Sequence, residues 1–102
     1  DMKLAFIDLN GMSQQLYAAL GPERSQAMHP LNNGKLDNTH YNNYGAMQLA
    51  RLVAQGLREA RVPVAAALRD DLGPIDPARP QPPEQFRMAA SPGFTQQRPL
   101  GD

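Results

Sequence analysis

The feature that most constrains the fold is a short apolar run near the start of the chain, Leu4-Ala5-Phe6-Ile7, which ends at Asp8. The run has no alternation of polar and apolar residues, so it predicts a strand buried on both faces, as in a parallel sheet. Such a strand needs a neighbour on each side, because buried backbone N–H and C=O groups must be paired. No other convincing strand is evident in the sequence. The chain is therefore predicted to be part of an α/β domain whose other strands lie elsewhere, in a longer chain or in a partner.

An amphipathic helix is predicted directly after this run. Its apolar residues recur at spacings of three and four, which is typical of a helix with one buried face; they are Leu9, Met12, Leu16 and Leu20. Gly21 can cap this helix, and Pro22 can start another short helix through about Met28. A strand followed by a helix is half of a βαβ unit.

A polar loop is predicted over residues 29–43, which contain five asparagines and almost no periodicity. A loop of this length inside a compact unit is more often functional than idle. It leads to a predicted helix from Tyr44 to about Arg61, with Asn43 as the N-cap and Pro63 beyond the end. The expected apolar stripe of this helix is Ala46, Leu49, Ala50, Val53, Leu57 and Ala60.

Composition divides the chain into residues 1–72, which hold these predicted elements, and a tail, residues 73–102. In the tail, proline, glutamine and arginine are frequent and large apolar residues are few. Such a composition is typical of an extended segment that is mobile or lies on a surface. Phe86, Met88 and Phe94 could pin this tail to the rest of the molecule.

Composition also argues against several classes of function. Ten basic residues balance ten acidic ones, and no cluster of Lys and Arg suggests a nucleic-acid partner. The absence of cysteine excludes disulfides and thiolate metal sites. No run approaches the roughly 18 apolar residues of a membrane span, so no membrane partner is expected. No ligand spacing predicts a metal, and no cofactor is expected.

The residues that carry chemistry are Asp37-Asn38-Thr39-His40, in the polar loop just before the second long helix. The two-residue spacer, held in a turn, lets the Asp37 carboxylate accept a hydrogen bond from the imidazole Nδ1 of His40. The Nε2 atom is then free to take a proton from a nucleophile. Taken by itself, an Asp-x-x-His spacing is also typical of a surface turn or a helix cap.

The residues around this pair each have two interpretations. Tyr41 and Asn38 could bind substrate, Tyr41 through its aromatic face and Asn38 through hydrogen bonds of its amide. Packing at the helix start and turn formation are the alternatives. His29 is predicted to be a solvated loop histidine. Three serines lie in no recognisable nucleophile motif; they are Ser13, Ser25 and Ser91.

The segment DNTHYNNYGA, which begins at Asp37, lies within a stretch from Leu36 to Leu57 that resembles the closing motif block of the SGNH (GDSL-type) hydrolases. Within that superfamily it is most similar to the rhamnogalacturonan acetylesterase-like carbohydrate esterases. Further segments match this group less specifically; they are Phe6-Ile7-Asp8-Leu9-Asn10, Leu20-Gly21-Pro22-Glu23 and Pro82-Pro83-Glu84-Gln85-Phe86.

This resemblance implies the C-terminal part of a flavodoxin-like three-layer α/β/α fold. Asp37 would be the triad acid and His40 the general base. The family takes its nucleophilic serine from a Gly-Asp-Ser block, and its oxyanion donors from that serine and from later glycine and asparagine blocks. None of these blocks is present in this sequence, so the chain alone is expected to be inactive.

The implied function is hydrolysis of acetyl esters on a plant cell-wall polysaccharide of the rhamnogalacturonan or pectin type. The implied partners are that polysaccharide and the remainder of the hydrolase domain, as a missing N-terminal part or a partner chain. A secreted or periplasmic location follows from the polymeric substrate. Two alternatives stay open: a non-catalytic binding or assembly module that retains the motif, and an SGNH esterase or lipase that acts on other esters.

Overall fold

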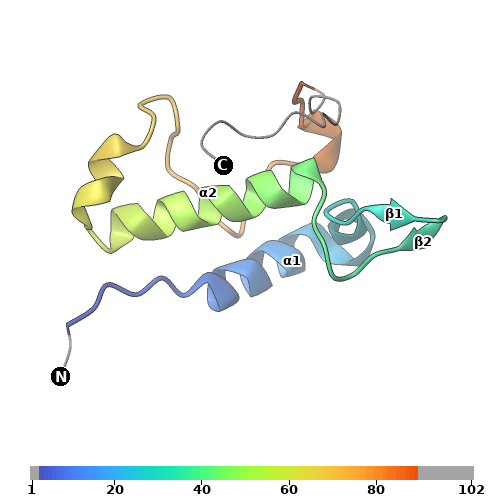
Figure 1. Cartoon of the computed structure of the whole chain (residues 1–102), viewed down its shortest axis with the longest axis horizontal. Helices are drawn as coiled ribbons and strands as arrows, with labels where there is room; N and C mark the ends of the chain where they lie inside the picture. The colour runs from blue at the N-terminus through green and yellow to red at the C-terminus, as the bar shows by residue number, and fades with distance from the viewer. Residues whose placement is uncertain (1–2, 90–102) are drawn as a thin grey trace, which may run out of the picture.

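The computed structural model describes residues 3–89, in which two long helices pack against each other and the later part of the chain lies across them (Figure 1). The helices are α1 (Leu9–Gln26) and α2 (Asn43–Glu59). Two short strands, β1 (Leu31–Asn32) and β2 (Lys35–Leu36), lie between the helices in the sequence and form a hairpin at one end of the helix pair. Within the described residues, no helix is both long enough and apolar enough to cross a membrane. The architecture is rich in α-helix with one small sheet, which fits part of an α/β domain.

Helix α1 forms and breaks where its sequence predicts. The Asp8 carboxylate caps its start by accepting from the backbone N–H of Gly11 at 2.9 Å. Gly21 interrupts the helical path with φ 76° and ψ 176°, and Pro22 restarts it. Leu16 and Leu20 are buried. The predicted sequence of helix, glycine break and short second helix is confirmed.

The hairpin replaces part of what was predicted as an irregular loop. Leu31 pairs with Leu36 and Asn32 pairs with Lys35 in antiparallel register. Asn33 and Gly34 form the two-residue turn, with φ of 51° and 76°. Positive φ at both turn positions matches the twist of the paired strands, which is why Asn-Gly is a strong hairpin signal.

Helix α2 begins one residue before its predicted first residue. Asn42, not Asn43, is the N-cap, because the Asn42 side chain accepts from the N–H of Gly45 at 3.0 Å. The buried face also differs from the predicted stripe, since it is centred on Tyr44, Gln48 and Leu52. Three members of the predicted stripe are exposed; they are Ala46, Ala50 and Val53. The physical reason is that α1 and the tail pack on the other side of the helix.

The predicted buried strand over residues 4–7 is wrong for this structure. Residues 3–8 have no regular secondary structure, and the side chains of Leu4 and Phe6 are 75% and 80% exposed. A lone strand cannot pair its backbone groups, and no strand within residues 3–89 lies beside it. Ile7 alone of this run is half-buried, where it packs close to Gly56.

The core lies between the two helices, and the described part of the tail closes one side of it. The core residues are Leu16, Leu20, Met28, Tyr44 and Leu52. Beyond the 3₁₀ turn η1 (Pro63–Ala67), the tail runs back along α2. There the guanidinium of Arg58 donates to the carbonyl oxygens of Gly73, at 2.7 Å, and of Leu72. Further along the tail, Ile75 and Phe86 pack against the core.

The end of the described tail is a second 3₁₀ turn, η2 (Pro83–Gln85), held by polar and aromatic contacts. The Tyr44 hydroxyl donates to the carbonyl oxygen of Gln81 at 2.7 Å, and the Tyr44 ring meets Phe86 edge-on at 5.5 Å. Phe86 therefore pins the tail as predicted. Met88 is exposed, and Phe94 lies outside the described residues.

Gly45 is predicted to be intolerant of any side chain. A Cβ atom there would collide with the backbone oxygen of Met28 and lie 2.9 Å from Cδ1 of Tyr41. Gly45→Ala should therefore lower the free energy of unfolding by roughly 1–3 kcal/mol, although alanine is the better helix former. Chemical denaturation measures this change. Ala46→Ser adds one atom at the exposed neighbouring position and should stay within about 0.5 kcal/mol of wild type; equal effects of the two substitutions would contradict the close packing.

Candidate active site

The loop between β2 and α2 carries the Asp37–His40 turn, and several elements fix its position (Figure 1). The backbone N–H of Asp37 donates to the carbonyl oxygen of Pro30 at 2.9 Å, and that of Asn42 donates to Met28 at 3.0 Å. The turn is thus fastened at both ends to the segment that follows α1.

Asp37 is the hydrogen-bonding centre of the turn. Its Oδ1 accepts from the backbone N–H of Thr39 at 2.8 Å and of His40 at 3.2 Å. Its Oδ2 accepts from Nδ2 of Asn32 at 2.7 Å and bonds to Nδ1 of His40 at 2.9 Å. Four donors on one carboxylate fix its position and favour its charged form.

These contacts lower the pKa of Asp37 from its ordinary value. The hydrogen bond from the Thr39 N–H is the largest cause, and the bond from the His40 side chain comes next. Asp37 is therefore an ionised carboxylate at neutral pH, beside an imidazole that would gain positive charge on taking a proton. A fixed negative charge at this place stabilises that imidazolium.

His40 is held on one side of its ring and open on the other. The Nδ1 atom faces Asp37, whose side chain is only 13% exposed, whereas the His40 side chain is 74% exposed. The edge of the ring that carries Nε2 is accessible to a reacting group. The structure thus brings together the Asp37 carboxylate and the His40 imidazole, the pair that the sequence predicts as acid and base, and Nδ1 is the ring atom that faces the carboxylate.

Asn32 was missed as a candidate site residue by sequence reasoning. It lies on β1, five residues before Asp37, and reaches the carboxylate because the hairpin folds back on itself. The Asn33-Gly34 turn was the available signal. Once that turn is taken as a two-residue hairpin, the strand register carries Asn32 to the start of the Asp37 turn.

The two predicted substrate-binding residues occupy different environments. Tyr41 follows the base directly, is exposed, and stacks on the ring of His29 with centroids 5.1 Å apart. Asn38 is exposed within the turn. Both lie next to the acid and base, although Tyr41 also has a packing contact of its own.

The sequence predicts that His29 is a solvated loop histidine, and this prediction is wrong. Its Nε2 lies 2.9 Å from the hydroxyl of Tyr17, and its Nδ1 lies 2.9 Å from the carbonyl oxygen of His40. The sequence interpretation failed because the partner ring of Tyr17 comes from α1, twelve residues earlier. A local sequence pattern cannot predict that contact.

The two described serines bond to their own helix. Ser13 Oγ donates to the carbonyl oxygen of Asn10 at 2.9 Å, and Ser25 Oγ donates to that of Pro22 at 3.3 Å. Ser91 lies outside the described residues. Neither described hydroxyl bonds to His40. Within residues 3–89, no group of three or more His, Asp or Glu side chains is arranged to hold a metal ion.

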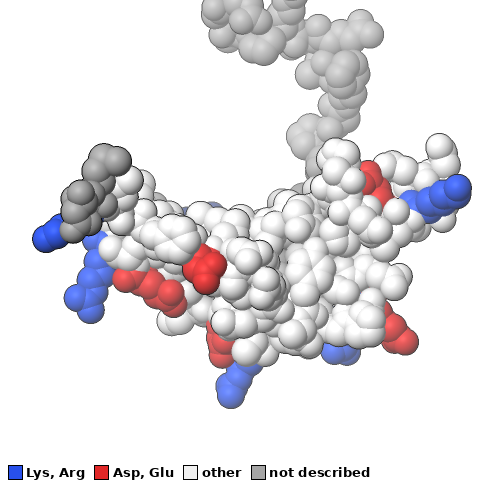
Figure 2. All heavy atoms as spheres, turned by 90° about the horizontal axis from the view of Figure 1, so that it is seen from below, with Lys and Arg blue, Asp and Glu red and all other residues white. Residues whose placement is uncertain are grey.

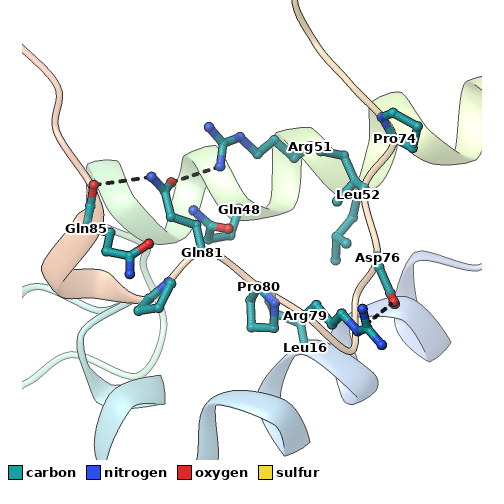
Figure 3. A pocket seen from close by; sticks show the side chains of 12 residues that line it. Leu16, Gln48, Arg51, Leu52, Pro74, Asp76, Arg79, Pro80, Gln81 and Gln85 are labelled. Atoms are coloured by element: carbon teal, nitrogen blue, oxygen red, sulfur yellow. Dashed lines mark hydrogen bonds and ion pairs between the residues drawn. The ribbon is translucent and has the colours of Figure 1, made fainter.

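A cavity of about 350 Å³ lies between α1, α2 and the tail, lined by neither Asp37 nor His40 (Figure 3). Arg51 crosses it to donate to Oε1 of Gln81 at 2.9 Å. The amide nitrogen of Gln48, another lining residue, is buried and has no hydrogen-bond partner among the described residues. The cavity is thus separate from the acid–base pair. Over the face seen in Figure 2, basic and acidic side chains are interspersed, and no patch of one sign forms there.

Comparison with known proteins gives one informative match. Rhamnogalacturonan acetylesterase RhgT of Bacillus subtilis (strain 168) is 37% identical over 73 residues, which cover 63% of this chain and 32% of the relative. The chain has partial similarity to a rhamnogalacturonan acetylesterase. This finding confirms the resemblance noted in the residues and supports an origin among carbohydrate esterases. The chain spans about a third of the relative's length. No protein-family model and no solved structure matches it.

The lowered pKa of Asp37 predicts a specific dependence of stability on pH. Because folding lowers this pKa below 3.8, the stabilisation is fully present above that value and is lost as the pH falls through the folded-state pKa. The difference in unfolding free energy between wild type and Asp37→Asn should shrink in acid, as the Asp37 carboxylate takes up a proton. Denaturation at a series of pH values measures it. A difference that does not change with pH would contradict the assigned contacts.

Proposed function

We propose that this chain is the part of a serine carbohydrate esterase that supplies the acid and base of the catalytic triad, with Asp37 as the acid and His40 as the base. The observation that carries the proposal is the 2.9 Å contact between Oδ2 of Asp37 and Nδ1 of an otherwise exposed imidazole. The nucleophilic serine comes from outside this segment. In the complete enzyme, that serine reaches the open Nε2 edge of His40.

The proposed reaction is acyl transfer in two steps. His40 takes the serine proton through Nε2 while the serine oxygen attacks the acetyl carbonyl, and the resulting imidazolium returns the proton to the departing sugar oxygen. Water then attacks the acetyl-serine, with His40 again as base. Asp37 keeps Nδ1 protonated and stabilises the imidazolium throughout. Donors for the oxyanion come from the same outside part as the serine.

The partner proposed for this chain is the remainder of a flavodoxin-like α/β/α domain. Leu4 and Phe6 are exposed on a segment whose composition suits a buried strand, and one side of α2 exposes Ala46, Ala50 and Val53. Covering these surfaces with a sheet would pair the backbone of residues 4–7 and remove apolar area from water. The chain's similarity to about a third of a longer esterase supports this proposal.

The proposed substrate is an acetylated polysaccharide of the rhamnogalacturonan or pectin type. The name of the bacterial relative supports this substrate class. Tyr41 and Asn38, exposed on either side of His40 in the sequence, are the proposed contacts to the sugar. A polymeric substrate of this kind is met outside the cytoplasm, so we propose a secreted or periplasmic location.

The isolated 102-residue chain should not hydrolyse acetyl esters. It offers an acid and a base, but within residues 3–89 no serine hydroxyl bonds to the base. Incubation with p-nitrophenyl acetate measures this directly, with His40→Ala as the matched control for background imidazole reactivity. Hydrolysis that exceeds the control and is lost with His40 would show that this chain carries its own nucleophile.

A chimeric enzyme tests the proposed function itself. The segment of RhgT that matches this chain is exchanged for the corresponding residues of this chain, and release of acetate from acetylated rhamnogalacturonan is measured. The chimera should be active, and His40→Ala should lower kcat by roughly 10⁴-fold or more, because triad members act as a unit. Lys35→Ala, at an exposed hairpin residue, should leave kcat unchanged.

Two results of this experiment would overturn the proposal. A folded chimera without activity would favour the alternative of a non-catalytic module that retains the motif. An active chimera in which His40→Ala costs less than about tenfold would remove His40 from the role of base, since triad knockouts cost far more.

A further inference from the structure

Three rings from separate parts of the chain meet next to the backbone of His40, the candidate base. Tyr17 comes from α1, His29 follows that helix, and Tyr41 follows His40; we refer to these three as the ring cluster. The ring of His29 stacks with Tyr17 at 6.2 Å and with Tyr41 at 5.1 Å between centroids. The hydroxyls of Tyr17 and Tyr41 lie 3.4 Å apart. The cluster therefore joins helix α1 to the catalytic turn.

The hydrogen bonds assign the proton on His29. The carbonyl oxygen of His40 can only accept, so the Nδ1 atom of His29, 2.9 Å away, must carry a hydrogen. In the neutral ring, Nε2 is then an acceptor, and the Tyr17 hydroxyl at 2.9 Å is its donor.

Tyr17 is suited to remain that donor. Burial is the main cause that raises the pKa of its hydroxyl. The phenol therefore keeps its proton throughout the range in which an esterase base works. Its neutral hydroxyl selects the Nδ1-protonated form of His29, which is the form that can donate to the backbone of His40.

The bond from His29 reaches the carbonyl oxygen of His40, a backbone group that Asp37 does not contact. Asp37 accepts from the backbone N–H of His40 and contacts its Nδ1, so it fixes the N-terminal side of the residue and the ring. His29 fixes the carbonyl side, 2.9 Å away. Backbone groups held on both sides restrict φ and ψ at His40, and with them the direction in which its side chain leaves the chain.

We infer that His29 is a positioning residue for the base: together with Tyr17, it locks the His40 backbone so that the imidazole keeps its Nδ1–H toward Asp37. The catalytic importance of this role rests on the proposed function. The effect of His29 on the tautomer of His40 does not, because that tautomer can be measured in this chain alone.

The test is nitrogen NMR of the full 102-residue chain labelled with ¹⁵N-histidine. In wild type, at a pH where both imidazole rings are neutral, both His29 and His40 should be protonated at Nδ1. His29→Gln removes the donor to the His40 carbonyl and should shift the His40 ratio of Nδ1–H to Nε2–H forms by roughly fivefold toward Nε2–H, the effect of one lost hydrogen bond. His29→Asn, whose amide N–H lies near the position of Nδ1, is the matched control and should restore most of the wild-type ratio.

A second variant keeps the inference testable if His29→Gln does not fold, as judged by helical circular dichroism. Tyr17→Phe removes only the hydroxyl, so His29 should shift toward Nε2 protonation and the His40 ratio should shift in the same direction. An Nε2-protonated His29 in the wild-type chain would overturn the inference. So would an unchanged His40 ratio in a folded His29→Gln or Tyr17→Phe variant. A failed chimera with the predicted tautomers would refute the proposed function and leave His29 as a positioning residue.

Discussion

The structure depends most on Asn42, a single side chain that joins the end of one helix to the start of the next. Its Nδ2 donates to the carbonyl oxygens of Ala27 at 2.7 Å and His29 at 3.2 Å, while its Oδ1 caps α2. Its backbone N–H donates to Met28 at 3.0 Å. These bonds satisfy carbonyls left free at the end of α1 and an N–H left free at the start of α2. Because the Asp37–His40 turn is the segment just before Asn42, the bonds that join the helices also set where that turn lies.

Asp37 and His40 are held by local contacts, in the segment whose position the hydrogen bonds of Asn42 fix. Asp37 and His40 are three residues apart, and the N–H groups that hold the carboxylate belong to the same turn. Asn32 comes from the adjoining hairpin, and the contact to the His40 carbonyl comes from His29. Within residues 3–89, the hydrogen bonds that fix the pair therefore come from residues 29–40, and the Tyr17 hydroxyl bonds to His29. On the proposed function, the acid and base are therefore in place before the rest of the enzyme is present, which is the preorganisation that efficient proton transfer needs.

Sequence reasoning was most successful where the determining contacts are short in sequence. The helix at Leu9, its break at Gly21 and the Asp37–His40 contact all depend on residues within about one helical turn, so local patterns predicted them. The hairpin at Asn33-Gly34 could have been predicted, because its turn chemistry is also local.

Other features depend on distant partners and could not be read from local patterns. The ring contact between Tyr17 and His29 and the face of α2 that becomes buried both require knowledge of what packs where. The run at residues 4–7 has the composition of a buried strand, but a strand needs neighbours to pair with. Here composition and structure disagree because a local pattern cannot supply a partner.

The exposed apolar surfaces contribute none of the hydrogen bonds described for Asp37 and His40, which has a consequence for how a complete esterase would assemble on the proposed function. Leu4 and Phe6 precede α1, and the uncovered part of α2 lies beyond the cap at Asn42. Contacts that hold Asp37 and His40 involve none of these surfaces. Docking of a sheet against them would therefore bury apolar area without rearranging the base. On the proposed function, the outside part must bring its serine to a His40 that already points toward it, so the accuracy of that docking, and not remodelling of the turn, would determine the catalytic rate.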